Sequence, residues 1–199
     1  FLYGLKGKPC IQITDDKSCK MIIDGIPVTI LRQERNPLNI PWRQYGADVV
    51  IDCSGTFKDP TTPVDDKKGS IRGHLNGGAK VVIHSAPFKI KNKALATPED
   101  TTTLIYGINH TAFDRKKHFL VSAASCTTTG LAHMVKPLLE NEDTSRILTA
   151  SMSTIHAVTN TQSVLDKMPK AGESDIRKTR SILNNIILTS TGAAKALVE

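Results

Sequence analysis

Two short runs of apolar and β-branched residues, each followed by a turn of small residues, constrain the fold most. The first run is ADVVIDCSGTF, residues 47–57, and the second is AKVVIHSAP, residues 79–87. The stretch between them reads as a helix over Asp65–Asn76 that stops at Gly77 and Gly78. Parallel strands need such a crossover connection. The pattern therefore predicts an α/β protein with a parallel sheet.

The turns after these two runs are candidate binding positions. Ligands of open parallel sheets lie beyond the carboxyl ends of the strands. The residues expected to face a crevice there are Ser54, Gly55, Phe57 and Ser85.

The flanking segments carry weaker signals. Three short strand-like runs open the chain, namely CIQIT (10–14), KMIID (20–24) and PVTILRQ (27–33). Asp24 and Gly25 form a hairpin turn signal between the second and third runs. Residues 89–103 are polar and irregular, which predicts a surface loop.

Composition excludes several classes of protein. With 39% hydrophobic and 23% charged residues over 199 positions, the chain can bury a core. The four cysteines form no CxxC pair and no zinc spacing, so we expect no metal and a reducing compartment. No apolar run is long enough to span a bilayer. We therefore expect a soluble, cytoplasmic protein.

The net charge of +7 indicates an anionic partner. Nucleic acid, a nucleotide and a phosphorylated metabolite all stay open at this point. Basic residues are scattered and aromatic residues make up only 5% of the chain, which argues against single-strand stacking sites.

One cysteine occupies a position suited to chemistry. In VSAASCTTTGLAHMVKPLLE (121–140), Cys126 directly precedes apolar residues at helical spacing. The start of a helix offers unpaired N–H groups and a positive dipole end, which stabilise a thiolate. Cys126 is thus a candidate nucleophile, and a small buried side chain is the alternative.

A nucleophilic thiol needs a base, and His156 is the best candidate among the six histidines. It follows the apolar and β-branched run SRILTASMSTIHAVTNTQ (145–162), which reads as a strand. If the two residues act together, we expect the sulfur and a ring nitrogen to lie about 3 to 4 Å apart.

Several motifs resemble those of phosphorylating glyceraldehyde-3-phosphate dehydrogenases. The most specific are SAASCTT (122–128), STIHAVTNTQ (153–162) and ILTSTGAAKA (187–196). Four further segments are similar to that family, namely ILRQERNPLNIPW, CSGTF, GGAKVVIHSAP and YGINH. The resemblance implies the later part of a Rossmann-like parallel-sheet cofactor domain at 1–125, followed by the start of an α+β catalytic domain at 126–199.

The resemblance also implies roles for individual residues. Cys126 would attack the aldehyde of glyceraldehyde 3-phosphate, and His156 would take the hydroxyl proton as hydride leaves for the nicotinamide. Inorganic phosphate would then release the thioester. The residues implied for the two phosphate sites are Ser125, Thr127, Thr191 and Gly192 for one, and Thr159 for the other. The resemblance further implies a homotetramer and NAD as cofactor, with NADP not excluded. The cofactor-binding residues would be the four that are expected to face the crevice, Ser54, Gly55, Phe57 and Ser85.

Three alternatives remain open from the sequence. One is a relative such as erythrose-4-phosphate dehydrogenase, which shares the cysteine and the histidine. Another is an inactive homologue that binds nucleic acid, and the third is a thiol hydrolase. Phe1 is not an initiator methionine and the last residues read as an unfinished helix, so we expect a piece of a longer protein.

Overall fold

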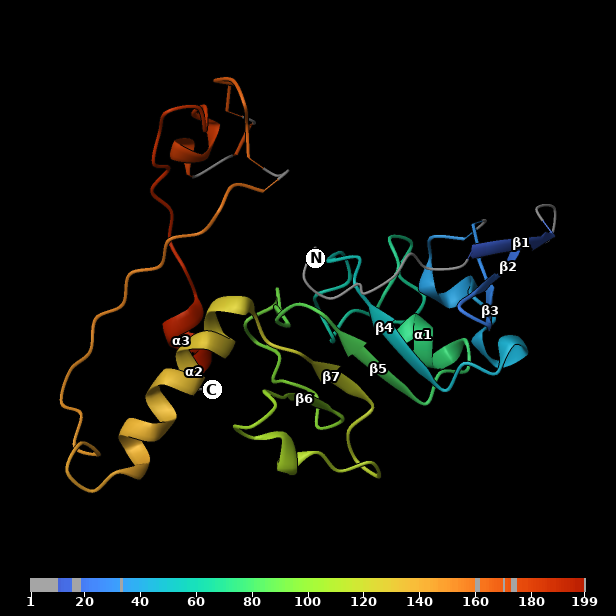
Figure 1. Ribbon diagram of the computed structural model, residues 1–199, viewed down its shortest axis with the longest axis horizontal. Coiled ribbons are helices and arrows are strands. Elements are labelled where there is room, and N and C mark those ends of the chain that lie inside the picture. The colour runs from blue at the N-terminus through green and yellow to red at the C-terminus, as the bar shows by residue number, and fades with distance from the viewer. Residues whose placement is uncertain are drawn as a thin grey trace.

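A parallel four-stranded sheet forms the centre of the protein (Figure 1). The computed structural model describes residues 11–15, 19–32, 34–159, 162–169, 171–172 and 175–198. The strand order is β4-β5-β7-β6. The bounds of these strands are Val49–Asp52 (β4), Val81–His84 (β5), Thr101–Thr103 (β6) and Leu120–Ser122 (β7). The α/β class expected from the sequence is confirmed.

All neighbouring strands of this sheet run in the same direction. Asp52 at the end of β4 pairs with His84 at the end of β5, which in turn pairs with Ser122 at the end of β7. The carboxyl ends of the strands therefore meet at one edge of the sheet, where ligands of such folds bind.

The main core lies on one face of the sheet. Val50, Val82 and Leu120 project from three adjacent strands and pack with Ile71 and Ala79. Helix α1, Arg72–Asn76, and the 3₁₀ helices η1, Pro37–Asn39, and η2, Trp42–Tyr45, lie on this side.

The opposite face is only partly covered. Val49 is 54% exposed and Ile51 is 65% exposed. The apolar run of β4 is therefore buried only at alternate residues, because side chains of a strand alternate between the two faces.

Helix α1 is shorter than the sequence predicts. It begins at Arg72, whereas the expected helix began at Asp65. The Asp66 side chain accepts the Lys68 N–H, and Gly69 adopts a φ of 84°. This local turn takes the place of helical backbone at residues 66–69, so the helix begins only at Arg72. The helix ends at Asn76, directly before Gly77, as the sequence predicts.

The first described strands form a separate antiparallel sheet. It consists of β1, Ile11–Asp15, β2, Lys20–Ile23, and β3, Ile26–Thr29. The predicted hairpin turn is confirmed, since Asp24 and Gly25 both have positive φ, at 49° and 82°. Such a pair of left-handed residues suits a tight two-residue hairpin. Cys10 and Gln33, which the expected strands included, lie outside the described residues.

Residues 89–103 form the expected irregular loop except at its end. Thr101–Thr103 become β6 and extend the sheet beside β7. The polar threonines gave no apolar pattern from which this edge strand could be predicted. The short 3₁₀ helix η3, His110–Ala112, follows.

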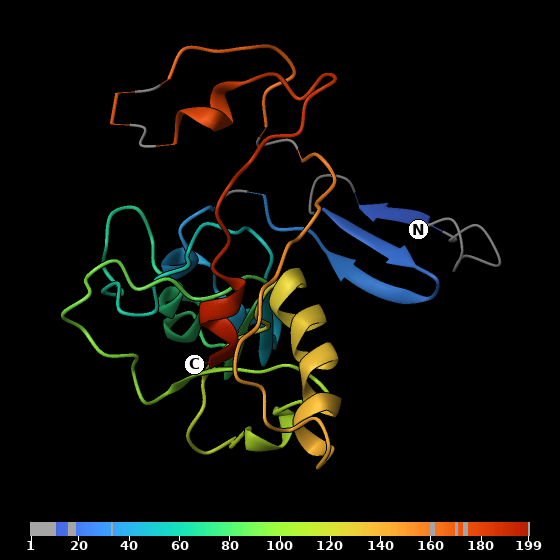
Figure 2. The same cartoon turned by 90° about the vertical axis from the view of Figure 1, so that its left-hand side faces the viewer.

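Helix α2, Cys126–Glu140, starts where the apolar periodicity predicts. After it the chain makes a long excursion away from the sheet and returns to α3, Ala193–Val198, which lies beside α2 (Figures 1 and 2). Within the described part of this excursion the only regular element is η4, Ile176–Thr179.

The strand predicted within residues 145–162 is wrong for its described residues. Their β-branched side chains favour an extended backbone, but no neighbouring strand pairs with them. Asn160 and Thr161 lie outside the described part. None of the helices that the structure describes is long and apolar enough to cross a membrane.

Candidate active site

A tight turn at the carboxyl end of β7 presents Cys126. Ser125 has an extended backbone and caps α2, and its Oγ accepts the Thr128 N–H at 3.1 Å. Cys126 is the first residue of the helix, and its side chain is exposed. The thiol therefore lies at the positive end of a helix of 15 residues, open to a substrate.

His156 lies beside this thiol. Its Nε2 is 3.9 Å from Cys126 Sγ, within the separation expected from the sequence. The other ring nitrogen, Nδ1, is 2.6 Å from the carbonyl oxygen of Ala157. Because a carbonyl only accepts, Nδ1 carries a hydrogen, and Nε2 is left to face the sulfur.

The two groups shift each other's pKa in the directions that favour an ion pair. Contact with His156, and then with the Thr127 hydroxyl, lowers the pKa of Cys126. The carbonyl of Ala157, and then Cys126, raise the pKa of His156. The arrangement thus favours a thiolate next to an imidazolium, which is the reactive form of a cysteine.

Two of the residues expected to bind phosphate lie at this thiol. Ser125 precedes Cys126 and is engaged in the helix cap. Thr127 Oγ1 is 4.0 Å from Cys126 Sγ.

The other three phosphate candidates lie on later segments. Thr191 Oγ1 accepts the Ala193 N–H at 3.3 Å, so it caps the start of α3, and Gly192 follows it. Thr159 lies three residues after His156, and its N–H donates to Gln162 Oε1 at 2.9 Å. Helices α2 and α3 are side by side in both views (Figures 1 and 2).

The expected cofactor residues follow β4 and β5. Ser54 and Phe57 line a cavity of about 590 Å³ at the end of β4. Gly55, between them, has a φ of 64°, which suits glycine, but it does not line the cavity. Ser85 donates its N–H to the Asp52 carbonyl and is also absent from the lining.

The sequence did not single out the other residues of this cavity. They are Arg35, Asn36, Thr56, Lys67 and Lys68. Three of them are cations from two separate segments. Arg35 and Asn36 belong to ILRQERNPLNIPW, which resembles the family, and Lys67 and Lys68 form a basic pair in a polar stretch. Neither signal placed these residues in one cavity. A cavity with cationic and hydroxyl groups and one aromatic ring fits an anionic nucleotide, so the residues present suit the nicotinamide dinucleotide that the sequence resemblance implies.

A buried pair of titratable side chains, Asp52 and His84, lies directly behind this edge of the sheet. His84 is fully buried, and its Nδ1 is 3.3 Å from Asp52 Oδ2. Burial acts to raise the pKa of Asp52, but His84 and the hydrogen bonds from Ser54 outweigh it and lower that pKa to about 2. The ring of His84 stacks on Phe88.

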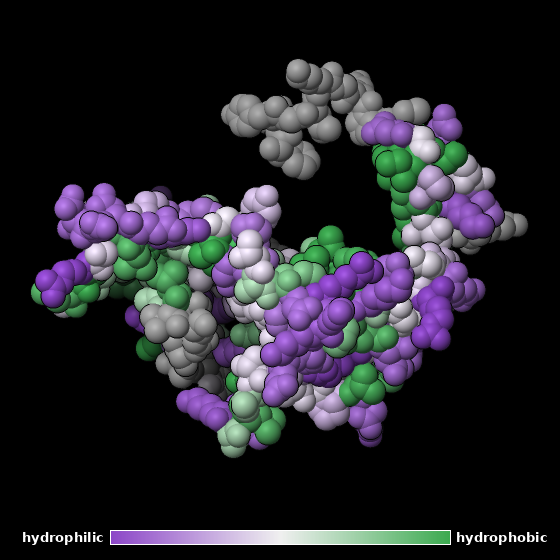
Figure 3. All heavy atoms as spheres, turned by 90° about the horizontal axis from the view of Figure 1, so that it is seen from below, coloured by the Kyte–Doolittle hydropathy of each residue, from purple (hydrophilic) through white to green (hydrophobic). Residues whose placement is uncertain are grey.

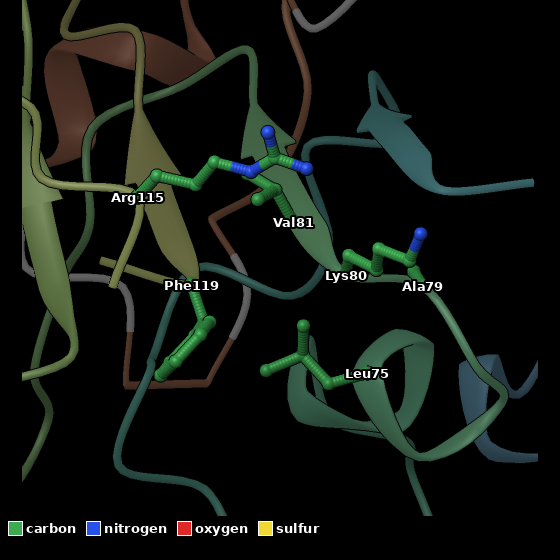
Figure 4. A pocket seen from close by; sticks show the side chains of 6 residues that line it. All are labelled: Leu75, Ala79, Lys80, Val81, Arg115 and Phe119. Carbon is green, nitrogen blue, oxygen red and sulfur yellow. The ribbon is translucent and has the colours of Figure 1, made fainter. Parts of the chain in front are cut away.

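A second cavity, of about 420 Å³, lies at the opposite edge of the sheet (Figure 4). Leu75 from α1 and Phe119 from the segment before β7 line it, together with the start of β5. Because the thiol lies at the carboxyl edge, this cavity is not part of the candidate site. Among the described residues, no three histidine, cysteine or carboxylate side chains gather as a possible metal site.

The fold and the site define an α/β protein with a cysteine–histidine pair at a strand-to-helix turn. Residues 125–199 match the family model described as the glyceraldehyde 3-phosphate dehydrogenase, C-terminal domain. Curated relatives named glyceraldehyde-3-phosphate dehydrogenase include those of Streptomyces coelicolor, 40% identical over 87% of this chain, and Lactarius deterrimus, 41% identical over 96%. The relative from Chlamydia pneumoniae is 42% identical over 82% of the chain.

The chain belongs to the glyceraldehyde-3-phosphate dehydrogenase family. It spans about half the length of these relatives, namely 44%, 56% and 42%. The expected division into domains at residues 125 and 126 stays a prediction.

Proposed function

We propose that this protein is a phosphorylating aldehyde dehydrogenase that converts glyceraldehyde 3-phosphate with NAD and inorganic phosphate. The observation that carries the proposal is the exposed Cys126 thiol at the start of α2, 3.9 Å from Nε2 of His156. The name shared by the relatives supports the choice of substrate.

In the first step the Cys126 thiolate attacks the aldehyde carbon. A carbon–sulfur bond forms, and the carbonyl oxygen takes the proton from Nε2 of His156 to give a hydroxyl. The ion pair supplies both the nucleophile and the acid without help from solvent.

His156 then acts as the base for the oxidation. Its neutral Nε2 takes the hydroxyl proton of the thiohemiacetal, while the hydrogen bond from Nδ1 to the Ala157 carbonyl holds the ring in place. A bound nicotinamide supplies the hydride acceptor for this oxidation. Ser54, Thr56, Phe57 and the cations Arg35, Lys67 and Lys68 would hold the dinucleotide.

Phosphate ends the cycle by attack on the thioester carbon, with Cys126 leaving as a thiolate. Ser125, Thr127, Thr191 and Gly192 would hold one phosphate group, and Thr159 the other. Hydroxyls and N–H groups suit this task because they orient a dianion without neutralising its nucleophilic oxygen.

The proposal includes a homotetramer in the cytoplasm. Reducing conditions there keep a thiol such as Cys126 free. Light scattering of the complete protein measures the assembly.

The test is NADH formation by the complete purified protein. We expect absorbance to rise with glyceraldehyde 3-phosphate and NAD only when phosphate or arsenate is present, and faster than with erythrose 4-phosphate. Cys126→Ser should lower kcat about a thousandfold or more, because the nucleophile is lost. Cys19→Ser, which removes another free thiol at a distant turn, is the matched control and should keep the rate.

A rate independent of phosphate would contradict the proposal, as would a Cys126→Ser variant with near-normal activity. Nucleic-acid binding without any NADH formation would favour the inactive homologue instead.

A further inference from the structure

The turn that leads to the thiol contains a buried alanine in the left-handed region. Ala124 has a φ of 57° and is 2% exposed. A residue with a Cβ seldom adopts this conformation, which glycine usually takes. Only Ser125 separates it from Cys126, so its backbone angles set the direction in which α2 leaves the sheet.

Ala124 is held in this conformation from two sides. Its N–H donates to Ser122 Oγ at 3.1 Å, and that hydroxyl donates to the Ala86 carbonyl at 3.0 Å. Its methyl group packs with Ile105 and Ala132 in the small core beneath α2. A strained backbone persists only where its surroundings fix it in this way.

The two members of the cysteine–histidine pair are not equally well fixed. His156 belongs to an exposed segment in which the described residues form no sheet pairs. The thiol, in contrast, follows a turn anchored to β7 and to the loop after β5. The fold therefore sets the distance between the sulfur and the imidazole mainly by fixing the position of Cys126.

We propose that Ala124 is a positioning residue, whose left-handed conformation, held by the Ser122 hydroxyl, directs the Cys126 thiol toward His156. This inference rests on the role proposed above for Cys126. It predicts that residues tolerant of a positive φ at position 124 preserve the reactivity of the thiol, and that β-branched residues lower it.

The experiment compares Ala124→Gly, Ala124→Val and Ala132→Val in the complete protein. Ala132 is the matched control because it is equally buried in the same core but lies inside α2, with ordinary helical backbone. The readout is the rate of Cys126 alkylation by iodoacetamide against pH, with the labelled cysteine identified by peptide mass. Thermal unfolding of each variant is recorded alongside.

We expect Ala124→Gly to stay within about twofold of the parent rate at pH 6, since glycine accepts the positive φ. Ala124→Val should lower that rate about tenfold or more and move the midpoint toward the free-thiol value of about 8.5. Ala132→Val should lower the unfolding temperature without moving the midpoint. If Ala124→Val does not fold, Ser122→Ala replaces it and should raise the midpoint in the same direction.

Three results would overturn the inference. The first is an unchanged midpoint of Cys126 alkylation in Ala124→Val, or in Ser122→Ala where that variant replaces it. The second is equal loss in the glycine and valine variants, which would assign the effect to the methyl group. The third is an equal shift in Ala132→Val. If Cys126 of the parent protein reacts like a free thiol, the proposed function fails together with the inference. If Cys126 of the parent is activated and only the variants behave otherwise than expected, the inference about Ala124 fails alone.

Discussion

The thiol of Cys126 depends on a neighbour 30 residues away in the chain. Among the groups that lower its pKa, the His156 side chain comes first and the Thr127 hydroxyl second. The pKa of His156 is raised in return. Both shifts favour a thiolate next to an imidazolium, so alkylation should begin at a lower pH than for an isolated thiol.

Replacing His156 should remove this advantage. With His156→Gln we expect the midpoint of Cys126 alkylation to rise, because the group that lowers the thiol pKa most is lost, and the rate at pH 6.5 to fall severalfold. His133→Gln, at an exposed histidine of α2, is the control and should leave the profile unchanged. A His156→Gln profile that matches the parent would show that the ring does not activate the thiol.

A second prediction at the residue scale concerns the buried pair of Asp52 and His84. The pKa of Asp52 is lowered to about 2, so the pair stabilises the fold above the unfolded value of about 3.9 and loses this effect as pH falls toward about 2. Asp52→Asn should therefore lower the free energy of unfolding by about 2 kcal/mol at pH 7 and by clearly less at pH 3.

Urea unfolding at several pH values measures this difference. The control is Asp48→Asn, because that carboxylate is 62% exposed and pairs with Lys80 at the surface. Its effect should stay within about 0.5 kcal/mol. An Asp52→Asn effect that is the same at pH 7 and pH 3 would contradict the prediction.

At the scale of elements, one arginine joins α1 to the segment before β6. Arg72 Nη1 and Nη2 donate to the two carboxylate oxygens of Asp100, both at 2.8 Å, and Nε donates to the Pro60 carbonyl at 2.6 Å. Asp100 in turn accepts the N–H groups of Phe119 and Leu120 through its carbonyl. The arginine thus fixes three segments at one point.

Arg72→Lys should break this arrangement. A lysine ammonium group lacks the planar set of donors with which the guanidinium binds both Asp100 oxygens and the Pro60 carbonyl at once. We expect the free energy of unfolding to fall by about 1–2 kcal/mol at pH 7. Arg72 lowers the pKa of Asp100, so the loss should shrink as pH falls below the unfolded value of about 3.9. Lys80→Gln removes an exposed ion pair and should cost under about 0.5 kcal/mol; equal losses in both variants would refute the comparison.

At the scale of the whole molecule, many apolar side chains reach the surface. Seen from below, they appear between hydrophilic residues, including on the arm formed by β1, β2 and β3 (Figure 3). The most exposed include Leu148 at 94%, Ile155 at 103%, Met168 at 86% and Ile186 at 92%. Where such side chains gather into a continuous apolar surface, they mark contacts with further protein.

The 199-residue chain, prepared by itself, should therefore self-associate and increase the fluorescence of a hydrophobic dye such as ANS. Light scattering over a range of concentrations measures the association, and the complete protein serves as the comparison. A monomer without dye binding at every concentration would contradict this prediction.

The sequence by itself determined the elements whose signals are local. The β-branched runs predicted β4 and β5, Asp24 and Gly25 predicted the hairpin turn, and the apolar spacing predicted α2. Each of these signals depends on backbone preference or periodicity within a few residues. The strand predicted from the long β-branched run before His156 did not form. A strand also needs a second strand to pair with, and no local sequence pattern shows whether one is there.

Only the tertiary structure decided which distant residues meet. It brought Cys126 within 3.9 Å of His156, and Asp52 within 3.3 Å of His84. It also gathered cations from residues 35, 67 and 68 into one cavity, and it held Ala124 at a positive φ. Such contacts depend on how strands and helices pack, because packing sets the distance between segments that the sequence keeps far apart.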